Sequence, residues 1–377
     1  MSQALEMVPE LIQEQAAFNA LVEALAREPR IGVDTESNSL HAYRERVCLM
    51  QFSTSQRDYV VDVLALEDVG KLGPVFESPR LEKIFHAAEY DIICLRRDYG
   101  FAVNNIFDTM QAGRILGRKM AGLDRLLEEK FGVKVNKRLQ KADWGARPLT
   151  REHLEYASLD THYLIALRDM LELELREKGL FELAQEDFRL AAVHYASGNR
   201  GRSESPSWDR LSARRDLSPQ ELTILKELLD WRELTAERLD RPPFKVMGDD
   251  KLIEIARLRP ADQTQLSAAG LSEKQMGQWG DHLLEAVARG LSRPPVQRRR
   301  SSLPDPAYMK RLELLKEWRK KAAAVMDVES DVVLPRGLLL ELADRGAQDV
   351  NAIMHASPWR KNRFGEQISA VLQSIPS

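Results

Sequence analysis

Four carboxylates and one tyrosine, carried by three short motifs, are the residues of this chain whose types and spacing could do chemistry. The motifs are IGVDTE, FHAAEYD and YASLD, and the five residues are Asp34, Glu36, Asp91, Tyr156 and Asp160. Carboxylates that come together repel one another, and their pKa values rise unless cations lie between them. Magnesium and manganese are the ions that an all-oxygen ligand set favours. Two such ions side by side are a common device for cutting a phosphodiester, so the motifs predict a metal-dependent hydrolytic site.

The first two motifs have local contexts that would position their acids. A strand is predicted over 30–36, and because side chains alternate along a strand, Asp34 and Glu36 share one face. Asp91 follows a short apolar strand, 83–85, and lies near the start of a helix. Taken singly, these acids could equally be a solvated pair at a strand end and an acid favoured by a helix dipole.

The third motif lies on a predicted long helix. Thr150 is a suitable N-cap, and apolar residues recur at helical spacing as far as Leu171. Tyr156 and Asp160 are four residues apart and therefore lie on the same helix face. Asp160 could bind a metal while Tyr156 holds a water molecule beside it, and the alternative is a packed tyrosine with a neighbouring surface acid.

The order of the three motifs resembles that of the DEDD superfamily of 3′→5′ exonucleases, and the spacing of Tyr156 and Asp160 resembles its tyrosine branch. The segments RVCLMQFST, DYVVDV, IFDTMQAGRILG and DWGARPLTREHLEYASLDTHYL extend this resemblance, over the first half of the chain, to the ribonuclease D family. The resemblance implies an α/β nuclease domain over 1–200, ribonuclease H-like, with a mixed central sheet.

The resemblance also implies a mechanism and a substrate. The four acids would hold two divalent ions, Mg²⁺ or Mn²⁺, Tyr156 would orient the attacking water, and nucleoside 5′-monophosphates would leave from the 3′ end of RNA. The implied partner is structured RNA with a single-stranded 3′ end, such as a tRNA precursor. Two alternatives stay open. A 3′→5′ DNA exonuclease of repair is one, because no residue pattern shows a contact to the 2′-hydroxyl. An inactive nucleic-acid-binding scaffold is the other, because a fold does not by itself guarantee activity.

A basic stretch just before the third motif is a candidate for substrate contact. It includes Lys137 and Lys141, and Arg147 follows in the sequence ARPL. Such cations could track a phosphate backbone. A solvated loop explains them equally well.

The second half of the chain contains an internal repeat, after a linker of composition GNRGRSESPS. The sequence LLDWR at 228–232 resembles LKEWR at 315–319, and Trp279-Gly280 resembles Phe364-Gly365 at a similar offset. The tryptophans lie on apolar helix faces, which predicts that they pack in a core.

Each repeat predicts a small all-α helical bundle, the first over 210–292 and the second over 304–377. Ser218, with Pro and Glu after it, and Ser272, with Gln275 three residues on, predict helix starts with capping boxes. Two such bundles after a nuclease resemble HRDC domains, which implies a part in binding nucleic acid.

The composition of the chain gives its net charge and favours a cellular compartment. The net charge is −3, divided as −6 over residues 1–200 and +3 over the remainder. No apolar run is long enough to span a bilayer, and the two cysteines, Cys48 and Cys94, predict reduced buried thiols and no disulfide. We therefore expect a cytoplasmic protein that does not enter a membrane, and a monomer is favoured.

Overall fold

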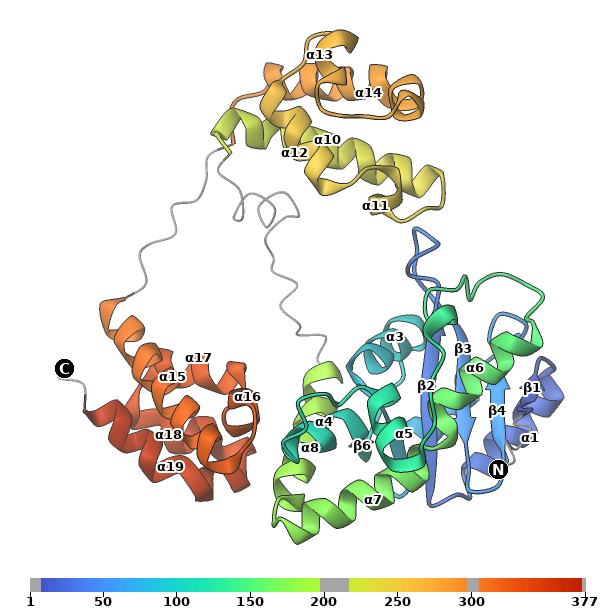
Figure 1. Ribbon diagram of the computed structural model, residues 1–377, viewed down its shortest axis with the longest axis vertical. Coiled ribbons are helices and arrows are strands. Elements are labelled where there is room, and N and C mark those ends of the chain that lie inside the picture. The colour runs from blue at the N-terminus through green and yellow to red at the C-terminus, as the bar shows by residue number, and fades with distance from the viewer. Residues whose placement is uncertain (1–7, 197–216, 297–304, 375–377) are drawn as a thin grey trace. The chain divides into compact units, whose positions relative to one another are not determined.

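A computed structural model describes three stretches of the chain, 8–196, 217–296 and 305–374 (Figure 1). Its residues form two compact units: one unit holds 8–37, 47–196 and 305–374, and the other holds 38–46 and 217–296. An α/β part, 8–196, precedes two stretches that are entirely helical, which confirms the predicted fold class.

The α/β part is built on one mixed sheet of six strands in the order β1-β4-β3-β2-β5-β6. The strands are β1 (Glu10–Ile12), β2 (Arg30–Ser37), β3 (Val47–Ser53), β4 (Asp58–Val61), β5 (Glu82–Phe85) and β6 (Ile106–Asp108). β3 is antiparallel to both of its neighbours, β2 and β4, whereas β1, β5 and β6 each join parallel to the strand beside them. The mixed central sheet is therefore confirmed, with β2 in its interior.

Helices cover both faces of this sheet (Figure 1). They are α1 (Gln15–Leu25), α2 (Gly73–Glu77), α3 (Glu89–Tyr99), α4 (Thr109–Ile115), α5 (Leu123–Phe131), α6 (Arg151–His162), α7 (Leu164–Glu177) and α8 (Phe181–Ala196). On one face Val33 of β2 packs in a cluster with Phe18 of α1 and Ile92 of α3. On the other face Leu49 of β3 packs with Ala157 of α6. The alternation of β2 therefore turns its acids toward α6.

The long helix predicted after Thr150 is in fact two helices. α6 ends at His162, α7 begins at Leu164, and Tyr163 between them (φ −90°, ψ −5°) is the C-cap of the first helix and the N-cap of the second. The physical reason is the sheet beneath: α6 packs over β2, β3 and β4, whereas α7 packs over β2 and β5. The chain must change direction as it crosses β2, so apolar periodicity continues through a bend that it does not reveal.

The first helical stretch is a bundle with aromatic side chains at its centre. Its helices are α10 (Pro219–Arg238), α11 (Pro243–Val246), α12 (Asp249–Leu258), α13 (Gln263–Ser267) and α14 (Glu273–Ser292). Trp231 of α10 meets Trp279 of α14 edge to face, with ring centroids 5.8 Å apart. Capping boxes form at Ser218 and Ser272, as predicted.

The second helical stretch repeats this arrangement. Its helices are α15 (Pro306–Met326), α16 (Ser330–Val333), α17 (Arg336–Arg345), α18 (Val350–Ile353) and α19 (Pro358–Gln373). Trp318 of α15 meets Phe364 of α19 edge to face at 5.5 Å. These residues stand at the repeat positions of Trp231 and Trp279, so the internal repeat of the sequence is also a repeat of core packing.

Buried ion pairs join α19 to the α/β part within one compact unit. The guanidinium of Arg360 is fully buried, and it pairs with Glu186 and Asp187 of α8 at 2.7 and 2.6 Å. It also donates to the backbone carbonyl groups of Val332 and Val333. A charge so buried is tolerated only with partners of this kind, so these contacts tie the last helices to the α/β part.

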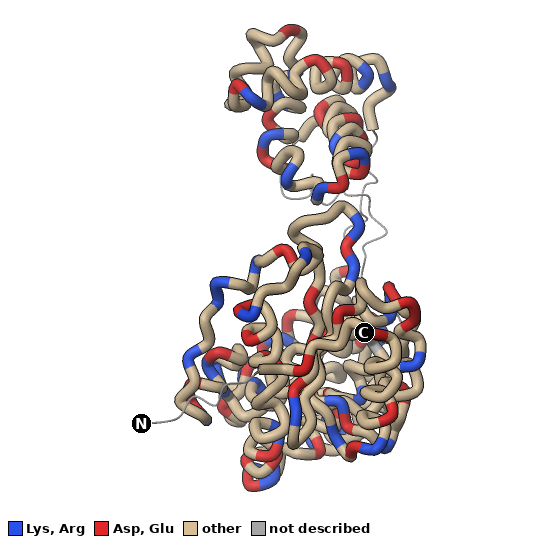
Figure 2. Tube along the Cα trace, turned by 90° about the vertical axis from the view of Figure 1, so that its right-hand side faces the viewer, with Lys and Arg blue, Asp and Glu red and all other residues tan. Residues whose placement is uncertain are grey.

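Charge on the helical stretches is mixed in sign. Figure 2 shows acidic and basic residues interspersed along both of them. Within the described residues, no helix combines the length and the apolar character that crossing a membrane requires.

Candidate active site

The face of β2 that points toward α6 carries a glycine and then two acids. Gly32, Asp34 and Glu36 occupy alternate positions of the strand. A Cβ atom at position 32 would lie 2.9 Å from the backbone oxygen of Thr161, near the end of α6. The absence of a side chain therefore lets α6 come close enough for its own acid to reach those of β2.

α6 supplies that acid and the tyrosine. Its start is defined by a capping box, in which the hydroxyl of Thr150 accepts from the backbone N–H of His153 and the imidazole of His153 accepts from that of Thr150. Its far end is held by a hydrogen bond of 2.6 Å between the hydroxyls of Ser53 on β3 and Thr161. With both ends located, Asp160 is directed at the face of β2 that carries Asp34.

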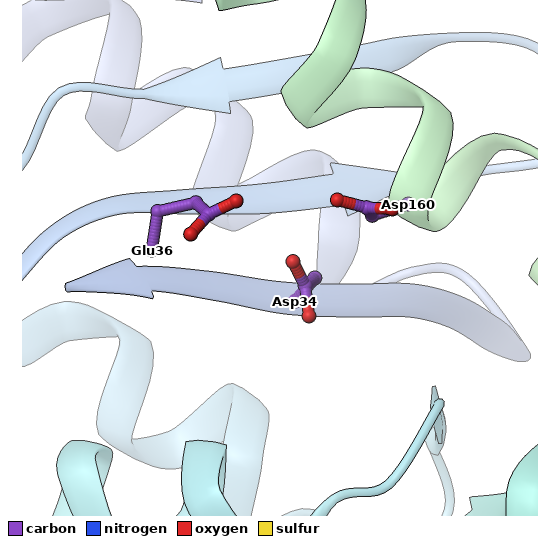
Figure 3. A group of neighbouring side chains, drawn as sticks. All are labelled: Asp34, Glu36 and Asp160. Carbon is purple, nitrogen blue, oxygen red and sulfur yellow. The ribbon is translucent and has the colours of Figure 1, made fainter. Parts of the chain in front are cut away.

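Three of the four predicted acids meet. Figure 3 shows Asp34 and Glu36 on β2 and Asp160 on α6 turned toward a common space, and one carboxylate oxygen from each lies within 4.8 Å of the others. Burial, and then the neighbouring carboxylates, raise the pKa values of Asp34 and Glu36 well above the usual range. An all-oxygen group whose members repel one another fits a divalent cation.

The fourth acid, Asp91, comes from the opposite layer. It lies in the first turn of α3, on the far side of the sheet, and one of its oxygens accepts hydrogen bonds from the backbone N–H and the hydroxyl of Thr35 at 3.0 and 2.6 Å. It is not one of the three acids that share the 4.8 Å cluster. Burial raises its pKa to about 7, and burial together with the charge of Asp91 raises the pKa of Asp160 to about 7.

Tyr156 lies beside the acids, and its ring packs against that of Trp144. The centroid of its ring is 5.9 Å from that of Trp144, at an interplanar angle of 30°, and the ring of His153 meets the same indole edge to face at 5.4 Å. Burial, followed by the charges of Asp160 and Glu36, raises the pKa of Tyr156 above its usual value. Its hydroxyl is therefore protonated at neutral pH and can orient a water molecule, but it cannot serve as a base.

Asp108 is a site-building residue that sequence reasoning missed. It is buried at the end of β6 and accepts hydrogen bonds from the backbone N–H groups of Ala87 and Ala88 just before α3. It also caps α4 through two further N–H groups. An acid that stands between an apolar strand and a helical pattern predicts an N-cap, so the sequence did carry a signal for this role of Asp108. The hydrogen bonds that Asp108 accepts from Ala87 and Ala88, in the turn before the helix that carries Asp91, have no signature in the local sequence.

His86 belongs to the same turn, and its contacts are structural. Its Nδ1 lies 2.9 Å from the hydroxyl of Thr109, and burial lowers its pKa to about 4. The imidazole is therefore neutral at physiological pH. It holds the end of β5 to the start of α4.

The residues predicted to contact substrate lie outside the cluster of acids. Lys137 is exposed and pairs with Asp124 at 2.8 Å. Lys141 lies in the exposed segment before Trp144. Arg147 has its guanidinium engaged by Asp62 and donates to the carbonyl of Trp144, so its contacts are those of a structural residue. Substrate contact by these three residues stays a prediction.

Family models match two parts of the chain. Residues 9–176 match the model described as 3′-5′ exonuclease, and residues 221–287 match the model described as HRDC domain. The first match spans the strands and helices that carry all five motif residues. The second spans most of α10, all of α11, α12 and α13, and most of α14.

Individual proteins extend these matches. Ribonuclease D of Nitrobacter hamburgensis is 30% identical over 373 residues, which cover 96% of this chain and 94% of that protein. The exosome complex exonuclease RRP6 of Saccharomyces cerevisiae is 34% identical over 280 residues, which cover 68% of this chain and 37% of that protein. The chain spans between 31% and 43% of the length of this and three plant RRP6-like relatives.

A solved structure shares the fold. The crystal structure of Escherichia coli RNase D matches with a TM-score of 0.71 at 24% identity, over 98% of this chain and 100% of that chain. At that identity the likeness speaks for the fold alone, and it extends over the α/β part and both helical stretches.

Proposed function

Because the chain belongs to the ribonuclease D family, we propose that it is a metal-dependent 3′→5′ exoribonuclease that removes nucleoside 5′-monophosphates from the 3′ end of RNA. The observation that carries this proposal is the convergence of Asp34, Glu36 and Asp160, from two separate elements, on one space within 4.8 Å. An arrangement of acids alone raises the energy of the folded protein unless a cation binds there.

The donor set fits the metal that the proposal requires. The 3′→5′ exonuclease family uses divalent ions, and we propose two of them, Mg²⁺ or Mn²⁺, held by Asp34, Glu36, Asp91 and Asp160. When bound, such ions activate a water molecule and stabilise charge on the scissile phosphate and the departing 3′-oxygen. The carboxylates hold and orient; no residue of the set forms a covalent bond to the substrate.

Tyr156 has a different role from the acids. Its hydroxyl remains protonated because its pKa is raised, so it fixes the position of the attacking water by hydrogen bonding. The indole of Trp144 holds the ring in place. Orientation of the nucleophile is therefore supplied by protein groups that do not change protonation state near neutral pH.

The proposed substrate is structured RNA that ends in a single strand, with tRNA precursors as the favoured case. The HRDC domain at 221–287 would hold the body of the RNA and raise the effective concentration of its 3′ end at the acids. We further propose that the protein works as a monomer in the cytoplasm. Its two cysteines, both buried and neither in a disulfide, are compatible with a reducing compartment.

The experiment that tests this function is a time course with RNA and DNA of the same sequence, each 5′-labelled and 3′-tailed, in Mg²⁺, Mn²⁺ or EDTA. Asp160→Asn removes one acid of the cluster. Glu152→Gln is its matched control, because Glu152 is an exposed acid on the same helix, at the far end from Asp160. Stepwise shortening of RNA that needs metal and Asp160 but not Glu152 is the expected result.

Two other outcomes would replace the proposal. Equal cutting of DNA would move the protein to DNA repair. RNA binding without cutting, unchanged by Asp160→Asn, would make it a nucleic-acid-binding scaffold.

A further inference from the structure

Gln51 lies in the middle of β3 with none of its surface exposed, and neither polar atom of its carboxamide has a hydrogen-bond partner in the part of the chain that the structure describes. A carboxamide can donate two hydrogen bonds and accept two. Leaving a buried polar group without a hydrogen-bond partner destabilises the folded protein, and such groups are rare. The polarity of this position therefore calls for a reason other than packing.

The register of the sheet places this carboxamide in the layer of the acids. Gln51 is the antiparallel partner of Asp34, and partners in an antiparallel pair project from the same face. The next pair on that face joins Leu49 to Glu36, and Leu49 packs in one cluster with Tyr156 of α6. On the side of Leu49, the carboxamide of Gln51 is therefore next to the contact between Leu49 and Tyr156.

In the other direction along β3 the carboxamide borders the contact with the acid of α6. Ser53, two residues beyond Gln51 on the same face, donates its hydroxyl to Thr161 at 2.6 Å. Thr161 directly follows Asp160. The side chain of Gln51 therefore lies on the face of β3 that α6 covers, beside Asp34. It is flanked along the strand by the contact of Leu49 with Tyr156 and by the contact of Ser53 with Thr161.

We propose that Gln51 is a positioning residue of the metal-loaded site, whose carboxamide takes its hydrogen-bond partners from a site carboxylate, or from water held there, when a divalent ion is bound. The inference rests on the metal use proposed above. Carboxylates that bind an ion have oxygen atoms and bound water that need partners of their own, and removing such outer partners lowers metal affinity about 10–100-fold. Gln51 acts through these groups and needs no contact with the substrate.

The first test is Gln51→Met, in the full-length protein, because methionine is unbranched and close to glutamine in size. We expect the Kd for Mn²⁺, measured by titration calorimetry, to rise about tenfold or more. The Tm in EDTA should stay the same or increase, since the variant removes a buried group without partners. A residue that only supports the sheet would change the Tm and leave the Kd for Mn²⁺ as it was.

A second variant tests the position independently of any cavity or loss of packing. Gln51→Glu places a further acid next to Asp34, so its Tm in EDTA should fall and its increase in Tm on adding Mn²⁺ should exceed that of the wild type. Ser357→Ala is the control, because the hydroxyl of Ser357 is another buried group without a partner but precedes α19. It should leave the Kd for Mn²⁺ unchanged.

The outcomes separate the inference from the function beneath it. A wild-type Kd for Mn²⁺ in Gln51→Met, or a Mn²⁺-dependent Tm shift in Gln51→Glu no larger than that of the wild type, would overturn the positioning role. Failure of the wild-type protein itself to bind Mn²⁺ would overturn both the proposed function and this inference.

Discussion

Thr35 and Asp91 connect the two layers of the site, since the backbone N–H and the hydroxyl of Thr35 both donate to the same oxygen of Asp91, at 3.0 and 2.6 Å. Thr35 is the residue between Asp34 and Glu36 on β2, and it projects from the opposite face. A single strand therefore presents two acids to α6 on one side and fixes the acid of α3 on the other.

This relationship predicts the effect of Thr35→Val. The variant keeps the size and the β-branch of the side chain but loses the hydroxyl, so Asp91 keeps one of its two hydrogen bonds from Thr35. We expect the Kd for Mn²⁺ to rise about tenfold, as for loss of a group that orients a metal ligand. Thr35→Ser retains the hydroxyl and should behave as the wild type in the same titration. Equal Kd values for the valine and serine variants would show that the hydroxyl does not orient Asp91.

The close approach of α6 to β2 predicts that Gly32→Ala separates the acids. The added methyl group would lie 2.9 Å from the backbone oxygen of Thr161 and 3.4 Å from the Cβ atom of Leu164, so α6 must move outward. A displacement of about 1 Å at a catalytic group can lower the rate about 10²-fold. Overpacking of this kind also costs about 1–3 kcal/mol of stability. Measured kcat and the free energy of unfolding should therefore both fall.

Gly337→Ala is the matched control for that substitution. Gly337 lies in α17, and a Cβ atom there would meet nothing within 4 Å. The control should be as active as the wild type and slightly more stable, because alanine is a better helix former than glycine. A Gly32→Ala variant with wild-type kcat would show that the position of α6 is not limiting.

The raised pKa of Tyr156 predicts how Tyr156→Phe behaves. Removing a hydroxyl that orients the nucleophile should lower kcat about 10²-fold and leave the Kd for Mn²⁺ unchanged, because the carboxylates are intact. Tyr163→Phe, at the bend between α6 and α7, is the control. The ratio of wild-type to Tyr156→Phe rates should stay constant between pH 7 and pH 9. A ratio that rises across that range would show that the phenol loses its proton in the reaction.

The acids predict a dependence of stability on pH that metal reverses. In the folded, metal-free protein Asp91 and Asp160 have pKa values of about 7, against about 3.9 for aspartate in an unfolded chain. Between these two values the folded protein binds more protons than the unfolded chain, so its stability falls as the pH rises. The loss is absent below the unfolded pKa and complete above the folded one.

Thermal unfolding measures this dependence. In EDTA the Tm should fall from pH 5 to pH 8, and Asp160→Asn should make that decrease smaller. Because protons compete with the cation for the same oxygens, the increase in Tm on adding Mg²⁺ should be larger at pH 8 than at pH 6. A Mg²⁺-dependent increase that is the same at both pH values would contradict the assignment of these acids as ligands.

Much of the site could be predicted from the sequence because its parts are local. Alternation along one strand places Asp34 and Glu36 on one face, and a spacing of four places Tyr156 and Asp160 on one face of α6. The helix starts at Ser218 and Ser272 were predictable for the same reason, since a capping box is formed by residues three apart. The periodicity of side chains and the capping of helices depend on a few consecutive residues, so they can be predicted without knowing the fold.

The tertiary structure decided which distant groups these local pieces meet. Asp91 reaches the site from the layer opposite α6, Gln51 lies beside Asp34 through a strand register, and Arg360 is paired with Glu186, 174 positions before it. None of these contacts has a sequence period, because each depends on how strands order in the sheet and on where a helix bends. The types of the acids were therefore determined by the sequence alone, whereas their distances and their supporting partners were determined only by the packing of the layers.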